Sequence, residues 1–358
     1  MGDIKTYKCP NCDGAITFDA TAQKMKCPYC KTEIDVASLV EYEDDKVHDD
    51  EDHFGWEEVN FDNVLSEEEG NLKRYICQSC GGEVVGDAYL ASSSCPFCGN
   101  PVIMEEQFEG ILRPDYVIPF KYNKEQAKEA MLKHFKGKFL LPNDFKSAGK
   151  LDKINGVYVP YWLFDADAKG GVRYRATRTN TFVSGDYNVT ETLHFLLYRE
   201  GIMHFEKIPN DASMKFDDKT LEALEPYDFN EIMDFKTAYL QGYLSDRYGV
   251  KPDDVKNRVN ERMRNSMIEE LSMTTVGYSS VIPESVRLSF NDGKVHYALL
   301  PVYVLHMKYH GKDYQFMMNG QTGKFVGDLP KDNGKLIIMM LSVFVITFIL
   351  CFLLMYVI

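Results

Sequence analysis

The pattern of hydrophobic and polar positions predicts three helices in the middle of the chain. The first covers residues 123–138, where Asn123 is a good N-cap and Gln126 follows three residues later, as in a capping box. A second helix is expected near 233–248. The third, near 252–271, places an apolar side chain at every fourth position. This spacing predicts one buried stripe, formed by Val255, Val259, Met263 and Met267.

Strand-like alternation fills much of the remaining middle part. Residues 171–208 alternate between apolar and polar side chains, with turns expected at 184–186 and 199–201. A β-meander is expected over 285–327, with turns at 291–293, 310–313 and 319–323. Helices combined with strands that are joined by short turns predict an α+β body rich in antiparallel sheet.

Two aromatic-rich strand segments resemble each other. VYVPYWLFDADA, residues 157–168, aligns with ALLPVYVLHMKY, residues 298–309, so that Pro160 matches Pro301. Proline inside a strand indicates an edge or a bulge. A duplicated half-domain and the common composition of strands explain this similarity equally well.

The end of the sequence has a different pattern, an uninterrupted apolar run. Residues 336–358 contain no charged side chain, and as a helix they would span roughly 34 Å, enough for a bilayer core. Lys331 and Lys335 precede the run. Because positive flanks stay in the cytoplasm, we expect a single-pass tail anchor whose N-terminal domains are cytoplasmic.

Cysteines supply the clearest chemical pattern. Eight of the nine form four CxxC pairs. The first two pairs enclose 14 residues, and so do the last two; the ninth cysteine, Cys351, lies in the apolar run. Thiolates are strong zinc ligands, and zinc prefers four ligands in a tetrahedron. We therefore expect two Zn²⁺ ions, one bound by Cys9, Cys12, Cys27 and Cys30 and one by Cys77, Cys80, Cys95 and Cys98. Rubredoxin-like iron and paired disulfides are the alternatives.

These patterns divide the chain into five segments. Between the two cysteine frames lies a stretch with fourteen acidic residues and one lysine, which we interpret as a solvated linker with apolar islands at 54–56 and 59–65. The predicted segments are zinc ribbon 1 (1–40), the acidic linker (41–70), zinc ribbon 2 (71–112), the α+β body (113–330) and the transmembrane helix (336–358).

Charge and motif content narrow the function classes. The net charge is −14 and the pI about 5.1, so most of the surface repels nucleic acid. A nucleic-acid-binding ribbon would need a basic patch, for which the first ribbon is the candidate through Lys5, Lys8, Lys24, Lys26 and Lys31. A closed Cys₄ site leaves no position for catalysis, and no catalytic motif is evident. We predict no enzymatic activity; a site in the aromatic-rich body is the remaining enzymatic hypothesis.

Several stretches together resemble a bacterial family of TFIIB-type zinc-ribbon-containing membrane proteins, often labelled replication-restart-helicase-like. They are KCPNC…KMKCPYC, SCPFCGNPVI, LRPDYVIPF, GVYVPYWLFDADA and MNGQTGKFVGDLP, which lie between residues 8 and 330. Nothing in the sequence matches a helicase core. The resemblance implies a component of an envelope-stress system, together with phage-shock-type and SPFH-type proteins at the bacterial inner membrane.

The sequence and the resemblance together predict a tail-anchored, cytoplasm-facing adaptor that recruits protein partners to the membrane. Two ribbons on one chain offer two contacts, which can bind together more tightly than either alone. A membrane-tethered nucleic-acid-binding protein, linked to replication or transcription, is the alternative function.

Overall fold

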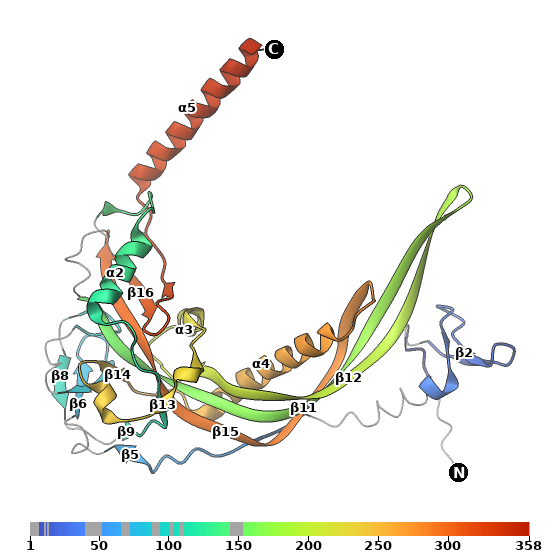
Figure 1. Ribbon diagram of the computed structural model, residues 1–358, viewed down its shortest axis with the longest axis horizontal. Helices are drawn as coiled ribbons and strands as arrows, with labels where there is room; N and C mark the ends of the chain where they lie inside the picture. The colour runs from blue at the N-terminus through green and yellow to red at the C-terminus, as the bar shows by residue number, and fades with distance from the viewer. Residues whose placement is uncertain are drawn as a thin grey trace. The chain divides into compact units, whose positions relative to one another are not determined.

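The computed structural model divides into two compact units. Figure 1 shows their helices and strands in order along the chain. Unit 1 comprises Met1–Trp56, Ala166–Phe205 and Asn260–Gly293, and unit 2 comprises Glu57–Asp165, Glu206–Val259 and Lys294–Ile358. The structure describes residues 7–10, 12, 14–39, 52–65, 72–87, 94–100, 103–106, 111–143 and 153–357. Lys5 and parts of the predicted linker and ribbons lie outside the described residues.

The expected α+β class is confirmed, and the strands of the described residues form three sheets. A three-stranded antiparallel sheet in the first ribbon contains β1 (Thr17–Asp19), β2 (Lys24–Lys26) and β3 (Glu33–Ile34). A two-stranded sheet pairs β5 (Val64–Leu65) with β9 (Ile111–Leu112).

The third sheet has twelve strands. Its main path runs β13-β10-β15-β11-β14-β7-β6-β8; β12 also pairs with β11, β4 and β16 with β15, and β17 with β16. Their bounds are β4 His53–Trp56, β6 Leu72–Cys77, β7 Glu83–Asp87, β8 Ile103–Glu106, β10 Tyr116–Val117, β11 Asn155–Ser184, β12 Tyr187–Asp211, β13 Met233–Asp234, β14 Leu244–Asp246, β15 Ser280–Tyr309, β16 Lys312–Asn319 and β17 Phe325–Val326.

The helices predicted from capping and periodicity are present. The capping box of Asn123 and Gln126 starts α2 (Lys124–Phe135), which buries Ala127, Met131 and Phe135. The longer α4 (Pro252–Met273) buries the predicted stripe of Val255, Val259, Met263 and Met267. Further helices are α3 (Asp218–Leu224), α5 (Asn333–Val357), and the short 3₁₀ helices η5 (Phe229–Glu231) and η6 (Thr237–Leu240).

The helix expected near 233–248 is wrong. This stretch holds β13, η6 and β14 instead, and Gly242 separates the last two with a φ of +81°. A right-handed helix cannot pass through that backbone conformation. Moreover, β14 pairs with both β11 and β7, and these tertiary hydrogen bonds replace helical ones.

Two of the expected turns are also wrong, because the strands continue through them. Residues 199–201 lie inside β12, and residues 291–293 lie inside β15. In β15 the register with β4 shifts between Phe290 and Gly293, and the ring of Trp56 occupies the space beside Gly293. The turn-forming residues 291–293 therefore form a β-bulge in a continuous strand. The turns at 184–186 and 310–313 and the turn in 319–323 are present.

The similarity between residues 157–168 and 298–309 has a structural counterpart. A short strand, a helix, a long strand and a returning strand occur in the order β10–α2–β11–β12 and again as β14–α4–β15–β16. The short strands are exchanged: β14 runs parallel to β11 at Val157, and β10 runs parallel to β15 at Ala298. Val157 and Ala298 are equivalent in the sequence alignment.

Hydrogen bonds at equivalent positions support the same relation. The carbonyl of Pro160 accepts from Ala212 N (2.9 Å), and that of Pro301 accepts from Gly320 N (2.8 Å). Two residues after each proline, a buried aromatic side chain reaches the loop before the helix: Trp162 Nε1 donates to Val250 O and Tyr303 Oη donates to Tyr122 O, both at 2.9 Å. Coincident pairing and bonding favour duplication of a half-domain with exchanged short strands.

Candidate metal centres

The two predicted cysteine sets converge as two separate groups. In each group the four sulfur atoms lie within 4.8 Å of one another. Sγ of Cys9 lies 3.5 Å from Sγ of Cys30, and Sγ of Cys12 lies 3.5 Å from Sγ of Cys27.

The second group repeats this arrangement at equivalent positions. Sγ of Cys77 lies 3.7 Å from Sγ of Cys98, and Sγ of Cys80 lies 3.7 Å from Sγ of Cys95. The outer cysteines of each frame are therefore paired with each other, and so are the inner ones. The frame that the sequence repeats is also repeated in space.

These separations fit a four-thiolate metal site. Four sulfurs at about 2.3 Å from a central zinc lie about 3.8 Å apart in a tetrahedron, close to the distances found in both groups. A disulfide would need about 2.05 Å, and all nine cysteines are free thiols in the structure. The residues fit Zn²⁺; iron in a rubredoxin-like site would use the same ligands.

Tight turns hold each pair of sulfurs. The residue after the second cysteine of a pair has a left-handed backbone at Lys31 (φ +63°), Gly81 (φ +64°) and Gly99 (φ +71°). In each of these turns its N–H donates to the carbonyl of the first cysteine, at 2.8–3.0 Å. Lys31 adopts a conformation that glycine adopts freely, at a cost of about 1 kcal/mol.

Polar side chains near the sulfurs were missed in the sequence. Two residues after the last cysteine of each frame, Thr32 Oγ1 lies 3.0 Å from Cys30 Sγ, and Asn100 Nδ2 donates to Cys98 Sγ at 3.4 Å. The hydrogen bond from Thr32 lowers the pKa of Cys30 to about 6. Such bonds stabilise thiolate ligands. Aligning the two frames could have found them, because both residues stand at the same offset.

Burial has the opposite effect on other sulfurs. It raises the pKa of Cys95 far above the ordinary range of a thiol. Four thiols so close together cannot all ionise unless a cation compensates their charge, and a bound metal does so. Each group is therefore a ligand set whose charge state depends on its metal.

The environments of the two centres differ at one equivalent aromatic position. Tyr29 and Phe97 each follow the third cysteine of their frame by two residues, and each ring lies over a glycine, Gly14 or Gly82. Tyr29 is 73% exposed. Phe97 is only partly exposed, and its ring centroid lies 5.2 Å from that of the buried Phe216. One aromatic ring therefore faces solvent, and the other joins the core of unit 2.

Further contacts fuse the second ribbon with the body. Strand β7 pairs with β14, and Glu83 binds both Arg74 (2.9 Å) and Arg247 (3.2 Å). His306 Nε2 lies 2.7 Å from Pro96 O, and Lys215 Nζ donates to Cys80 O at 3.4 Å. The second metal centre is therefore part of unit 2, whereas the first belongs to unit 1.

The lysines proposed as a basic patch on the first ribbon are partly used within it. Lys26 pairs with Glu33 at 2.8 Å, and Lys31 Nζ donates to Pro28 O at 2.9 Å. Glu33 thus neutralises one of the positive charges that would be needed to bind the phosphate backbone of a nucleic acid. Lys24 lies beside Lys26 on the same short strand, β2.

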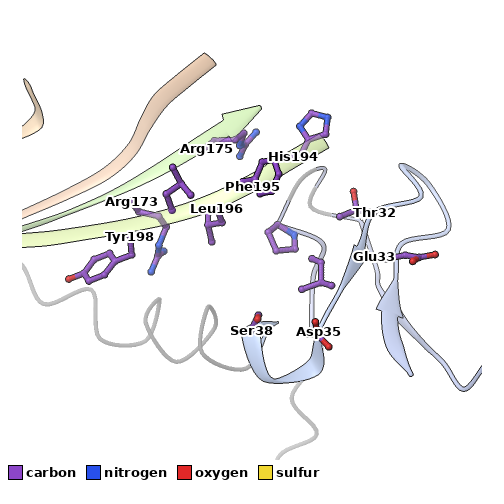
Figure 2. A pocket seen from close by; sticks show the side chains of 13 residues that line it. Thr32, Glu33, Asp35, Ser38, Arg173, Arg175, His194, Phe195, Leu196 and Tyr198 are labelled. Carbon is purple, nitrogen blue, oxygen red and sulfur yellow. The ribbon is translucent and has the colours of Figure 1, made fainter. Parts of the chain in front are cut away.

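A pocket of about 440 Å³ lies in unit 1 (Figure 2). Arg173 and Arg175 from β11 line one part, and Glu33 and Asp35 line another. Arg175 is already paired with Glu284 at 2.5 Å. No cysteine is among the described residues that line the pocket, so it is distinct from the metal centres.

Helix α5 is long and apolar enough to cross a membrane. Its candidate span, Asn333–Met355, has a mean hydropathy of 3.0, and none of it is buried in the structure. The helix is hydrophobic on all sides, as the exposed side chains of Ile337, Phe344 and Leu350 illustrate.

Comparison with known proteins finds a relative of uncharacterised function. The "Uncharacterized protein YdjG" of Bacillus subtilis (strain 168) is 33% identical to the chain over 332 residues, which cover 93% of this chain and 92% of the relative. No protein-family model matches the chain. No solved structure matches it.

Proposed function

The chain belongs to the family of Bacillus subtilis YdjG, and we propose that it is a membrane-anchored adaptor that binds protein partners through its first zinc ribbon. Helix α5 is the anchor and the Cys₄ sites hold Zn²⁺ as structural ions. Metal binding supplies the folding energy that so small a ribbon lacks. We assign it no catalytic role.

The exposed position of Tyr29 is the observation that carries this proposal. At the equivalent position of the second ribbon, Phe97 packs against the body. Phe18, on β1 of the first ribbon, is also 51% exposed. Aromatic side chains exposed on a small rigid module are typical anchors of protein interfaces. The second ribbon serves as a structural part of the body.

The orientation and the partners rest on other arguments. Lys331 and Lys335, which precede the uncharged run that starts at Leu336, favour a cytoplasmic location of both units at the inner membrane of a bacterium. The resemblance to TFIIB-type zinc-ribbon membrane proteins suggests SPFH-type and phage-shock-type partners in an envelope-stress complex. The acidic balance of the chain disfavours nucleic acid.

The test is affinity purification of the full-length protein from gently solubilised membranes, with and without nuclease, followed by mass spectrometry. The variant is Phe18→Ser/Tyr29→Ser, and the control is Phe182→Ser/Tyr187→Ser, which changes equally exposed aromatic residues on β11 and β12. We expect protein partners that the variant loses and the control keeps.

Two outcomes would contradict the proposal. Equal recovery of partners with variant and control would remove the first ribbon as the binding surface. Partners that disappear with nuclease would favour the nucleic-acid-binding alternative.

A further inference from the structure

The start of α5 is tied to the loop that follows α2. Asp332 N donates to Leu140 O at 2.8 Å. Lys335 Nζ donates to Leu141 O at 2.7 Å and to Asn143 Oδ1 at 2.8 Å. In Figure 1 the green segment after α2 accordingly lies beside the base of α5. These bonds connect segments that are almost 200 residues apart in sequence.

This attachment defines where the loop lies if α5 crosses a bilayer. The apolar run begins at Leu336, directly after Lys335. The first turn of α5 then lies at the boundary between lipid and water, where lysine flanks are typical. The loop bound to that turn must lie at the same boundary.

The side chains of this region suit a membrane surface. Phe139 is 57% exposed, although Leu141, two residues later, is buried. Lys133, Lys136 and Lys331 are exposed, and within the described part of the chain none of them forms an ion pair. Their positive charge contrasts with the net charge of −14 for the whole chain. An exposed aromatic ring among lysines is typical of contact with anionic lipid.

Two basic groups lie within hydrogen-bond distance of each other at the same place. Lys138 Nζ, three residues after the end of α2, lies 2.5 Å from Nε2 of His134 in its last turn. Burial lowers the pKa of both groups, and the charge of Lys138 lowers that of His134 further. An anion beside them would allow both to be charged.

We propose that residues 133–143, with Lys331 and Lys335, form a membrane foot that binds the headgroups of anionic phospholipids and places Phe139 among them. The inference rests on the proposed role of α5 as a membrane anchor. The foot holds unit 2 against the membrane surface, so that α5 is more than a flexible tether. The lysines attract the negatively charged headgroups, and Phe139 inserts its apolar ring between them.

The experiment places a fluorescent reporter at the tip of the foot. The full-length Phe139→Trp protein is reconstituted into phosphatidylcholine vesicles with and without phosphatidylglycerol, using bromine-labelled lipid as the quencher. The emission of the two native tryptophans is subtracted with the unsubstituted protein. We expect blue-shifted, lipid-quenched emission of the new tryptophan, strongest with phosphatidylglycerol. Replacing Lys133 and Lys136 by Glu should weaken the preference of the reporter for vesicles with phosphatidylglycerol by at least about fivefold for each lysine, because each substitution removes a positive charge and adds a negative one.

The control is Lys219→Glu/Lys236→Glu, which makes the same charge change at exposed positions elsewhere in unit 2. Water-like emission at position 139 in both kinds of vesicle would refute the foot, as would equal losses in variant and control. Alkaline carbonate extraction separates the two proposals. Protein that is extracted refutes the anchor, whereas protein that stays inserted with a water-exposed reporter refutes only the foot.

Discussion

The unequal packing of the two ribbons predicts that equivalent substitutions have unequal effects on stability. Phe97 and Tyr29 occupy the same place in the two cysteine frames, but only Phe97 packs on Phe216. We compare Phe97→Ala with Tyr29→Ala. The substitutions remove an aromatic ring from the same structural motif, so effects within the ribbon itself largely cancel.

The size of the difference follows from burial. Replacing a fully buried phenylalanine by alanine costs about 3–5 kcal/mol. Phe97 is partly exposed, so about half of that, ~2 kcal/mol, is expected for the free energy of unfolding of unit 2. Tyr29 is 73% exposed, and its replacement should change that free energy by less than about 0.5 kcal/mol.

The assay is urea unfolding of the full-length protein in detergent with excess zinc. All variants also carry Trp56→Phe, because Trp56 belongs to unit 1, and unfolding is then followed by the fluorescence of Trp162, which is fully buried in unit 2. Metal analysis of each variant must still find two equivalents, so that packing alone differs. Equal destabilisation by both substitutions, or none by Phe97→Ala, would refute the conclusion that the second ribbon is fused with the body.

Two further predictions concern charge and metal. Burial raises the pKa of Asp246 from its ordinary value of 3.8 to about 7. The folded protein therefore holds this proton more tightly than the unfolded chain, and the free energy of unfolding falls as the pH rises from about 4 to 7. Asp246→Asn should therefore raise the free energy of unfolding at pH 8 by up to about 4 kcal/mol and flatten its pH profile, and unchanged urea midpoints from pH 4 to 8 would contradict this. Cys12→Ser and Cys80→Ser should each lower the bound metal from two equivalents to one by elemental analysis, but only Cys80→Ser should shift the unfolding transition of Trp162; an equal shift would contradict the separation of the centres.

Local sequence patterns were sufficient to predict the helices, whose stabilising contacts join residues close together in the sequence. The capping box at Asn123 and the four-residue stripe of α4 depend on neighbours within a turn or two, and both helices are where the patterns place them. The turn expected at 291–293 failed because pairing with β4, more than 200 residues earlier, keeps that stretch extended. Turn-forming residues can serve a bulge equally well.

The sequence by itself determined the two ligand sets, the apolar terminal helix and the similarity between residues 157–168 and 298–309. These features depend on side-chain chemistry at fixed spacings, which is visible without a fold. The tertiary structure alone decided that β10 and β14 exchange partners, and that the second ribbon joins the body while Tyr29 of the first faces solvent. Backbone hydrogen bonds between distant strands create these arrangements. Such bonds use the same N–H and C=O groups in almost every residue, so side-chain patterns carry little information about which strands they join.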